Sequence, residues 1–80
     1  MNKQRRSWSD DAKLNTETML FDKSYMPRDG KVYFKHIDGG FGYINDLDVI
    51  QDNYNLYTVN EKTEQFKSIN ELIDDGWVID

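Results

Sequence analysis

Cysteine is absent from this chain of 80 residues, and proline and histidine each occur once. Without cysteine the chain forms no disulfide and no Cys-based zinc site, and nothing marks it for export. No apolar run approaches the roughly 20 residues of a membrane-spanning helix, and the N-terminus lacks the apolar stretch of a signal peptide. We therefore expect a protein with no membrane partner, located in the cytoplasm.

Motifs for catalysis, cofactors and metals are missing as well. There is no phosphate loop, no Gly-x-Gly-x-x-Gly and no serine–histidine–acid set with a strained nucleophile turn. The single histidine, His36, falls within an expected strand, which favours a structural or surface role. Asp46 and Asp48 begin like a calcium loop, but Ile50 occupies the third ligand position. We predict no enzymatic activity, no cofactor and no bound metal.

Basic residues are scarce in the second half of the chain. Residues 1–35 hold eight lysines and arginines against five acids, a net charge of +3. Residues 36–80 hold two lysines against ten acids, a net charge of −8. Such an asymmetry decides which surfaces the protein is drawn to, and does not decide its fold.

Length and composition predict one small folded domain. Hydrophobic residues make up 38% of the chain and aromatic residues 14%, which argues against disorder throughout. The aromatic residues fall mostly between Phe21 and Phe66, so we expect the core there.

The N-terminal segment, residues 1–15, is predicted to be a flexible or short-helical arm, followed by a single α+β domain over residues 16–80. Ser7 and Asp10 have the spacing of a capping box, which would start a short helix over residues 8–14. A helix of two turns is marginal in isolation.

A β-hairpin is the clearest local prediction. Residues 16–21 have strand-forming side chains, and a turn is expected over 26–30. Alternating residues 31–37 then predict a strand, Asp38-Gly39 a two-residue turn, and residues 40–44 the returning strand.

The chain after the hairpin predicts two further strands. Residues 45–53 form an acidic loop or a single helical turn. Residues 54–59 form a strand, 60–63 a turn, and 64–67 the start of the next strand.

A C-terminal helix is predicted over residues 68–75. Ser68 and Glu71 form a capping box, an apolar stripe follows at Ile69, Leu72 and Ile73, and Gly76 is a natural stop. Trp77-Val78-Ile79 reads as a short final strand. The expected fold is α+β: an antiparallel sheet of four to five strands with this one helix packed on it. A partly open β-barrel is the alternative.

Residues 30–44 resemble the opening hairpin of a cold-shock domain, a small barrel that binds single strands, because Gly-Phe-Gly-Tyr stands at 40–43. The resemblance covers 15 of the 80 residues, with Gly39 in place of a lysine of that family. In that family such a strand presents rings on which bases stack. The resemblance therefore implies a single-stranded nucleic-acid-binding module with the following contact residues: Lys31, Phe34, Lys35, Phe41 and Tyr43.

The acidic C-terminal part predicts a different partner. Asp74 and Asp75 end a helix whose C-terminus already carries partial negative charge, where cations are preferred. Carboxylates arranged like phosphates would fit a basic cleft that normally holds nucleic acid. In size and charge the chain looks like the small inhibitors that phages direct against host or defence proteins, anti-CRISPR proteins among them.

This first hypothesis is a non-enzymatic, phage-type inhibitor that occupies the nucleic-acid cleft of a larger basic protein. Its compartment would be the cytoplasm of a bacterial host. Carboxylates would mimic phosphates and two aromatic rings would pack against the partner, through these residues: Asp46, Asp48, Asp52, Tyr54, Asp74, Asp75 and Trp77. The basic run Lys3 to Arg6 would contact an acidic patch, nucleic acid or nothing.

Overall fold

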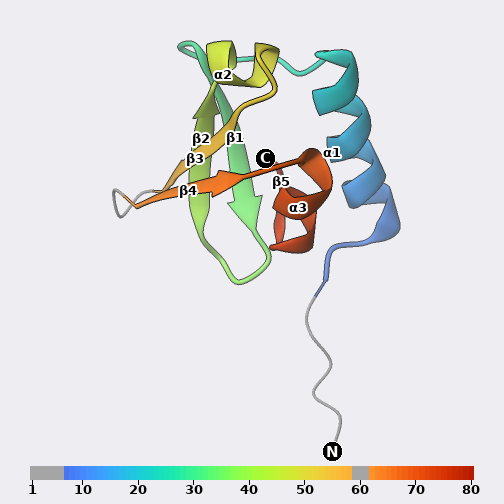
Figure 1. Ribbon diagram of the computed structural model, residues 1–80. Helices are drawn as coiled ribbons and strands as arrows, with labels where there is room; N and C mark the ends of the chain where they lie inside the picture. Colours follow the sequence, from blue (N-terminus) through green and yellow to red (C-terminus); the bar gives the residue numbers. More distant parts are fainter. Residues whose placement is uncertain (1–6, 59–61) are drawn as a thin grey trace, which may run out of the picture.

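Five antiparallel strands form one curled sheet in the computed structural model, which describes residues 7–58 and 62–80 (Figure 1). The strands lie in the order β4-β3-β2-β1-β5. The elements are, along the chain, α1 (Asp10–Asp22), β1 (Lys31–His36), β2 (Phe41–Asn45), α2 (Asp46–Ile50), β3 (Tyr54–Thr58), β4 (Thr63–Phe66), α3 (Ile69–Asp74) and β5 (Trp77–Ile79). The predicted α+β class is confirmed, with three helices instead of one in the described part of the chain.

Helix α1 replaces two elements predicted from the sequence, a short helix over 8–14 and a strand over 16–21. Ser9 caps this helix, because its side-chain oxygen accepts a hydrogen bond from the amide of Ala12 at 3.2 Å. Lys23 ends it in the left-handed conformation, with φ of 56°.

The strand predicted over residues 16–21 was wrong because tertiary packing outweighs the strand propensity of threonine and phenylalanine. Thr16 and Leu20 are four residues apart and therefore share one face of α1, and both are buried. α1 also crosses residue 15, where the sequence analysis placed a boundary; residues 1–6 of the predicted arm lie outside the described residues.

The predicted hairpin is confirmed, but its loop is one residue longer than expected. The amide of His36 donates to the carbonyl of Gly40 at 2.7 Å, which leaves residues 37–39 as the loop. Gly39 has φ of 102°, the positive value that the last residue of a three-residue hairpin loop adopts. Ile37 is released from the ladder, and its amide donates to the carbonyl of Gly76 at 2.9 Å.

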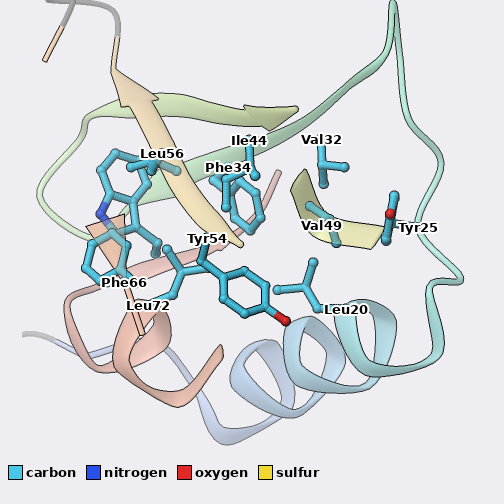
Figure 2. Close-up of a cluster of buried hydrophobic side chains, with 11 residues drawn as sticks. Leu20, Tyr25, Val32, Phe34, Ile44, Val49, Tyr54, Leu56, Phe66 and Leu72 are labelled. Carbon is cyan, nitrogen blue, oxygen red and sulfur yellow. The ribbon is translucent and has the colours of Figure 1, made fainter. Parts of the chain in front are cut away.

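The inner face of the sheet packs against α1 and α3, and the buried side chains between them form the core (Figure 2). Side chains alternate along each strand, so Val32 and Phe34 on β1 both point inward. Ile44 of β2 and Leu56 of β3 point inward from the neighbouring strands.

The later elements follow the prediction closely. The acidic segment after β2 forms α2, a single short helix, and β3 and β4 lie within one residue of their predicted bounds where described; Val59 and the first residues of the following turn lie outside the described residues. Ser68 caps α3 by accepting a hydrogen bond from the amide of Glu71 at 3.1 Å, and β5 follows as predicted. Within residues 7–58 and 62–80, no helix combines the length and apolar character needed to cross a membrane.

Candidate functional site

The outer face of the sheet gathers aromatic and basic side chains. Paired residues of antiparallel strands point to the same side, so the register identifies the side chains that β1 to β4 direct away from the core. We call these residues the outer face: Lys31, Tyr33, Lys35, Phe41, Tyr43, Asn45, Asn55, Tyr57, Thr63 and Gln65. None of them is acidic, although the whole chain holds 15 acids and has a net charge of −5.

Three tyrosines form a row across this face, one from each of three adjacent strands. Tyr33 pairs with Tyr43, and Tyr43 pairs with Tyr57. The ring centroids of Tyr43 and Tyr57 lie 5.4 Å apart in a stacked arrangement, and those of Tyr33 and Tyr43 lie 6.2 Å apart and are tilted. Cross-strand aromatic pairs stabilise a sheet by roughly 0.2–1 kcal/mol each, so the row also contributes to folding.

Cations lie over the rings of this row. The guanidinium of Arg28 is 4.9 Å from the ring centroid of Tyr33, and the ammonium of Lys31 is 5.1 Å from that of Tyr43. Arg28 is held there by a two-residue turn in which Asp29 and Gly30 both have positive φ, so that Arg28 pairs with Lys31 through two backbone hydrogen bonds. The proline-led turn expected over 26–30 is thus centred on its last two residues.

Four of the five residues implied by the cold-shock resemblance lie together on the outer face: Lys31, Lys35, Phe41 and Tyr43. Phe41 is 53% exposed. Phe34 is the exception, because it is fully buried on the inner face and offers no ring to a base. Tyr33 and Tyr57 were missed; the period-two alternation of both strands was the signal that could have found them.

The carboxylates of the first hypothesis fall into two groups. Asp46 is the first residue of α2 and Asp52 follows its C-terminal end. Each accepts a hydrogen bond from a buried tyrosine. The hydroxyl of Tyr25 donates to Asp46 at 2.7 Å, and the hydroxyl of Tyr54 donates to Asp52 at 3.3 Å. The Nζ atom of Lys23 lies 3.0 Å from Oδ1 of Asp52.

These contacts shift three pKa values. The hydrogen bond and charge of the Lys23 ammonium lower the pKa of Asp52. Burial, together with the nearby Asp52 carboxylate, raises the pKa of Tyr54 to about 12. Burial and the hydrogen bond to Asp46 raise the pKa of Tyr25 further above its ordinary value. The charge of Asp52 is thus partly neutralised by Lys23. The side chain of Tyr54 is 4% exposed, so its ring is part of the core.

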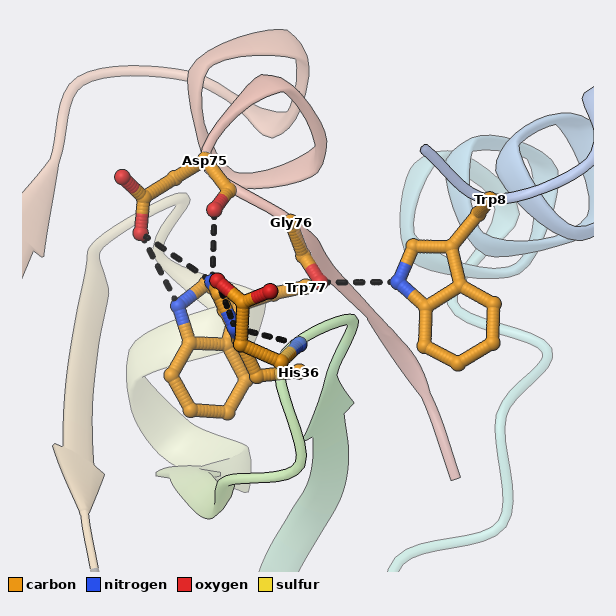
Figure 3. Close-up of polar contacts among 6 residues, drawn as sticks. Trp8, His36, Asp75, Gly76 and Trp77 are labelled. Carbon is orange, nitrogen blue, oxygen red and sulfur yellow. Dashed lines mark hydrogen bonds and ion pairs between the residues drawn. The ribbon is translucent and has the colours of Figure 1, made fainter. Parts of the chain in front are cut away.

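The second acidic group lies at the end of α3 (Figure 3). Asp75 accepts hydrogen bonds at two atoms, since Nε1 of Trp77 donates to its carboxylate at 3.2 Å and Nε2 of His36 lies 2.6 Å from its backbone carbonyl. The amide of Asp38 donates to Nδ1 of His36, so Nε2 is the nitrogen that donates to Asp75. Trp77 is 5% exposed, whereas Asp74 is exposed.

The two acidic groups lie at opposite ends of β1. The amide of Asp46 donates to the carbonyl of Gly30, just before this strand, and Asp75 contacts His36 at the other end. Six strand residues separate these ends by about 20 Å. The first hypothesis is therefore left with carboxylates in two separate patches, among which Asp46 and Asp48 are half-buried, and its two aromatic anchors are buried. Its basic run, Lys3 to Arg6, lies outside the described residues.

Comparison of the chain with protein-family models, curated protein sequences and solved structures finds no match. The fold and the outer face therefore carry the functional argument. Among residues 7–58 and 62–80 there is also no group of three or more histidine, aspartate and glutamate side chains placed to hold a metal ion.

Proposed function

We propose that the protein is a non-enzymatic binding protein whose outer face binds single-stranded nucleic acid. The observation that carries the proposal is the composition of this face: three tyrosines and Phe41, with Lys31 and Lys35, and no acid among the residues that β1 to β4 direct to it, in a strongly acidic chain. Aromatic rings stack on bases of any sequence, and lysines on the same surface attract the phosphates.

The geometry of the tyrosine row indicates where bases would stack. The ring of Tyr43 already contacts Tyr57 on one side and Lys31 on another. A base would therefore stack on an end of the row rather than insert between its rings. The end of the row at Tyr57 lies beside Thr63 of β4, a short polar side chain, and Phe41 is the most exposed ring of the face. These two rings are the preferred stacking positions, with phosphates near the two lysines.

Fluorescence anisotropy of a labelled oligothymidylate of about 12 nucleotides tests this proposal. We expect saturable binding at low salt, with a slope of log affinity against log salt of about −1.4 for two lysines on a single strand. Tyr57→Ala and Phe41→Ala should each weaken binding about tenfold, because base–aromatic stacking contributes roughly 1–3 kcal/mol per base.

Two control variants separate stacking from other effects. Tyr57→Phe keeps the ring and should bind like the native protein, and Phe21→Ser removes an exposed ring of α1, outside the outer face, and should leave binding unchanged. Absence of saturable binding, or equal losses in Phe21→Ser and Tyr57→Ala, would contradict the proposal.

Phosphate mimicry toward a basic protein is a second candidate, favoured by the uncompensated ends of the short helices. Neither α2 nor α3 has a basic residue in its last turn, so their carboxylates add to the negative C-terminal partial charge. The partner would be a larger basic protein, such as a phage-targeted host or defence nuclease. Asp48→Asn combined with Asp74→Asn should then reduce displacement of DNA from such a protein, as measured in a competition assay.

A further inference from the structure

Helix α1 lies beside α3 (Figure 1) and exposes a second apolar stripe. Leu14 is 61% exposed and Phe21 is 76% exposed. They are seven residues apart, which is two helical turns, so both lie along one line of the helix, with Glu17 between them. The core uses a different line of α1, that of Thr16 and Leu20. The exposed stripe therefore has no partner within the described residues.

A groove runs beside this stripe. Its larger part, about 560 Å³, lies between α1 and the segment that leads from β4 into α3, and it is lined by Phe21 and Ile69 among others. Its smaller part, about 280 Å³, continues between α1 and α3 past Leu14 and Ile73. Glu17 and Asn70 line both parts, so the two are adjacent along α1.

The charge of this groove is predominantly negative. Two lysines line it, Lys13 and Lys67, against five carboxylates: Asp10, Glu17, Asp22, Asp52 and Asp74. Of the five, Asp52 is the one that forms an ion pair within residues 7–58 and 62–80, with Lys23. The groove thus combines an apolar floor with a rim of net negative charge.

We infer that this groove binds a basic amphipathic helix of a partner protein. Leucine-like side chains of such a helix would cover Leu14 and Phe21, and its lysines or arginines would meet Glu17, Asp22 and Asp74. α1 has 13 residues and is about 20 Å long, which matches a partner helix of about three to four turns. The inference concerns a different face from the outer face and does not depend on nucleic-acid binding.

Charge excludes the other simple occupants. Nucleic acid would bring phosphates to an acidic rim, which repels them. A second copy that docked through the same groove in a two-fold dimer would bring the acidic rims of the two copies together. A cationic segment is the occupant that the carboxylates favour, and the apolar floor gives an amphipathic segment its anchors.

A labelled helical peptide of about 14 residues, with leucines on one face and lysines on the other, serves as the probe. We expect saturable binding by anisotropy. Phe21→Ser should weaken binding about tenfold, since it removes the more exposed of the two apolar anchors on the stripe. Leu47→Ser is the matched control, because Leu47 is 72% exposed on α2, away from the groove, and should bind as the native protein does.

A second pair of variants tests the acidic rim. Glu17→Gln with Asp22→Asn should weaken binding more than Asp11→Asn with Asp29→Asn, which changes the net charge equally outside the groove. The inference is overturned if the peptide does not bind at low salt, if Leu47→Ser weakens it as much as Phe21→Ser, or if both charge pairs act alike. Light scattering that shows a dimer abolished by Phe21→Ser would assign the stripe to self-association and overturn it too. Tyr57→Ala should leave peptide binding unchanged, which separates this surface from the outer face.

Discussion

Gly76 occupies a position that no residue with a Cβ atom can fill without rearrangement. Its φ is 113°, and a Cβ atom there would lie 2.6 Å from Nε2 of His36 and 2.9 Å from Cγ2 of Ile37. Its carbonyl also accepts hydrogen bonds from Nε1 of Trp8 and from the amide of Ile37 (Figure 3 shows the Trp8 bond). Gly76→Ala should therefore lower the free energy of unfolding by about 2–4 kcal/mol, as measured by urea denaturation.

Gly39→Ala separates the two causes of that loss, which are backbone strain at positive φ and the close contact of a Cβ atom with His36 and Ile37. Gly39 also has positive φ, at 102°, but a Cβ atom there would meet nothing within 4 Å. This variant should lose only the backbone strain, about 1–2 kcal/mol. Equal losses in Gly39→Ala and Gly76→Ala would show that the contact with His36 and Ile37 is not destabilising.

At the scale of elements, a buried hydrogen bond joins α1 to the edge of the sheet. The Oγ1 atom of Thr16 accepts a hydrogen bond from the amide of Ile79 in β5 at 3.1 Å, and Thr16 is buried. Thr16→Val keeps the volume and removes the acceptor, so it should destabilise the protein by about 1–3 kcal/mol. Hydrogen exchange of the Ile79 amide should accelerate in the same variant.

Thr16→Ser keeps the hydroxyl and is the control for this contact. It should retain most of the protection of the Ile79 amide, although it loses a methyl group from the core. Unchanged exchange in Thr16→Val would mean that β5 is held by its pairing with β1 and does not need α1.

Local signals in the sequence were sufficient for some elements and not for others. The hairpin and α3 were predicted because their signals are local. Alternation and Gly39 lie within the hairpin, and the Ser68 cap directly precedes α3. α1 was not predicted over its full length, because only Thr16 and Leu20 form its buried face. Two of its other apolar residues, Leu14 and Phe21, face solvent. Its helical period was therefore hidden among polar residues and two strand-forming threonines.

At the scale of the whole molecule, the charge along the chain says little about the charge on each surface. The basic and aromatic outer face draws Lys31 and Tyr33 from β1 and Tyr57 from β3, which are distant in sequence. Alternation along β1 and β2 is readable from the sequence, and it places Phe34 and Tyr33 on opposite faces of β1. The row across three strands required the pairing of β2 with β3, and the sequence has no local signal for that register.

Two buried tyrosine hydroxyls link the stability of the whole molecule to alkaline pH. Burial first, and then Asp46 and Asp52, raise the pKa of Tyr25 and Tyr54, the latter to about 12. In the unfolded chain both ionise near pH 10, so the unfolded state binds fewer protons above that pH and folding stability falls as pH rises. Between pH 10 and 12 the free energy of unfolding should decrease by up to about 1.4 kcal/mol per pH unit for each tyrosine.

Urea denaturation of the native protein and of the double variant Tyr25→Phe/Tyr54→Phe measures this decrease, because titration of the lysines is common to both proteins. The double variant should have the shallower slope, and equal slopes would show that neither hydroxyl has a raised pKa in the folded chain.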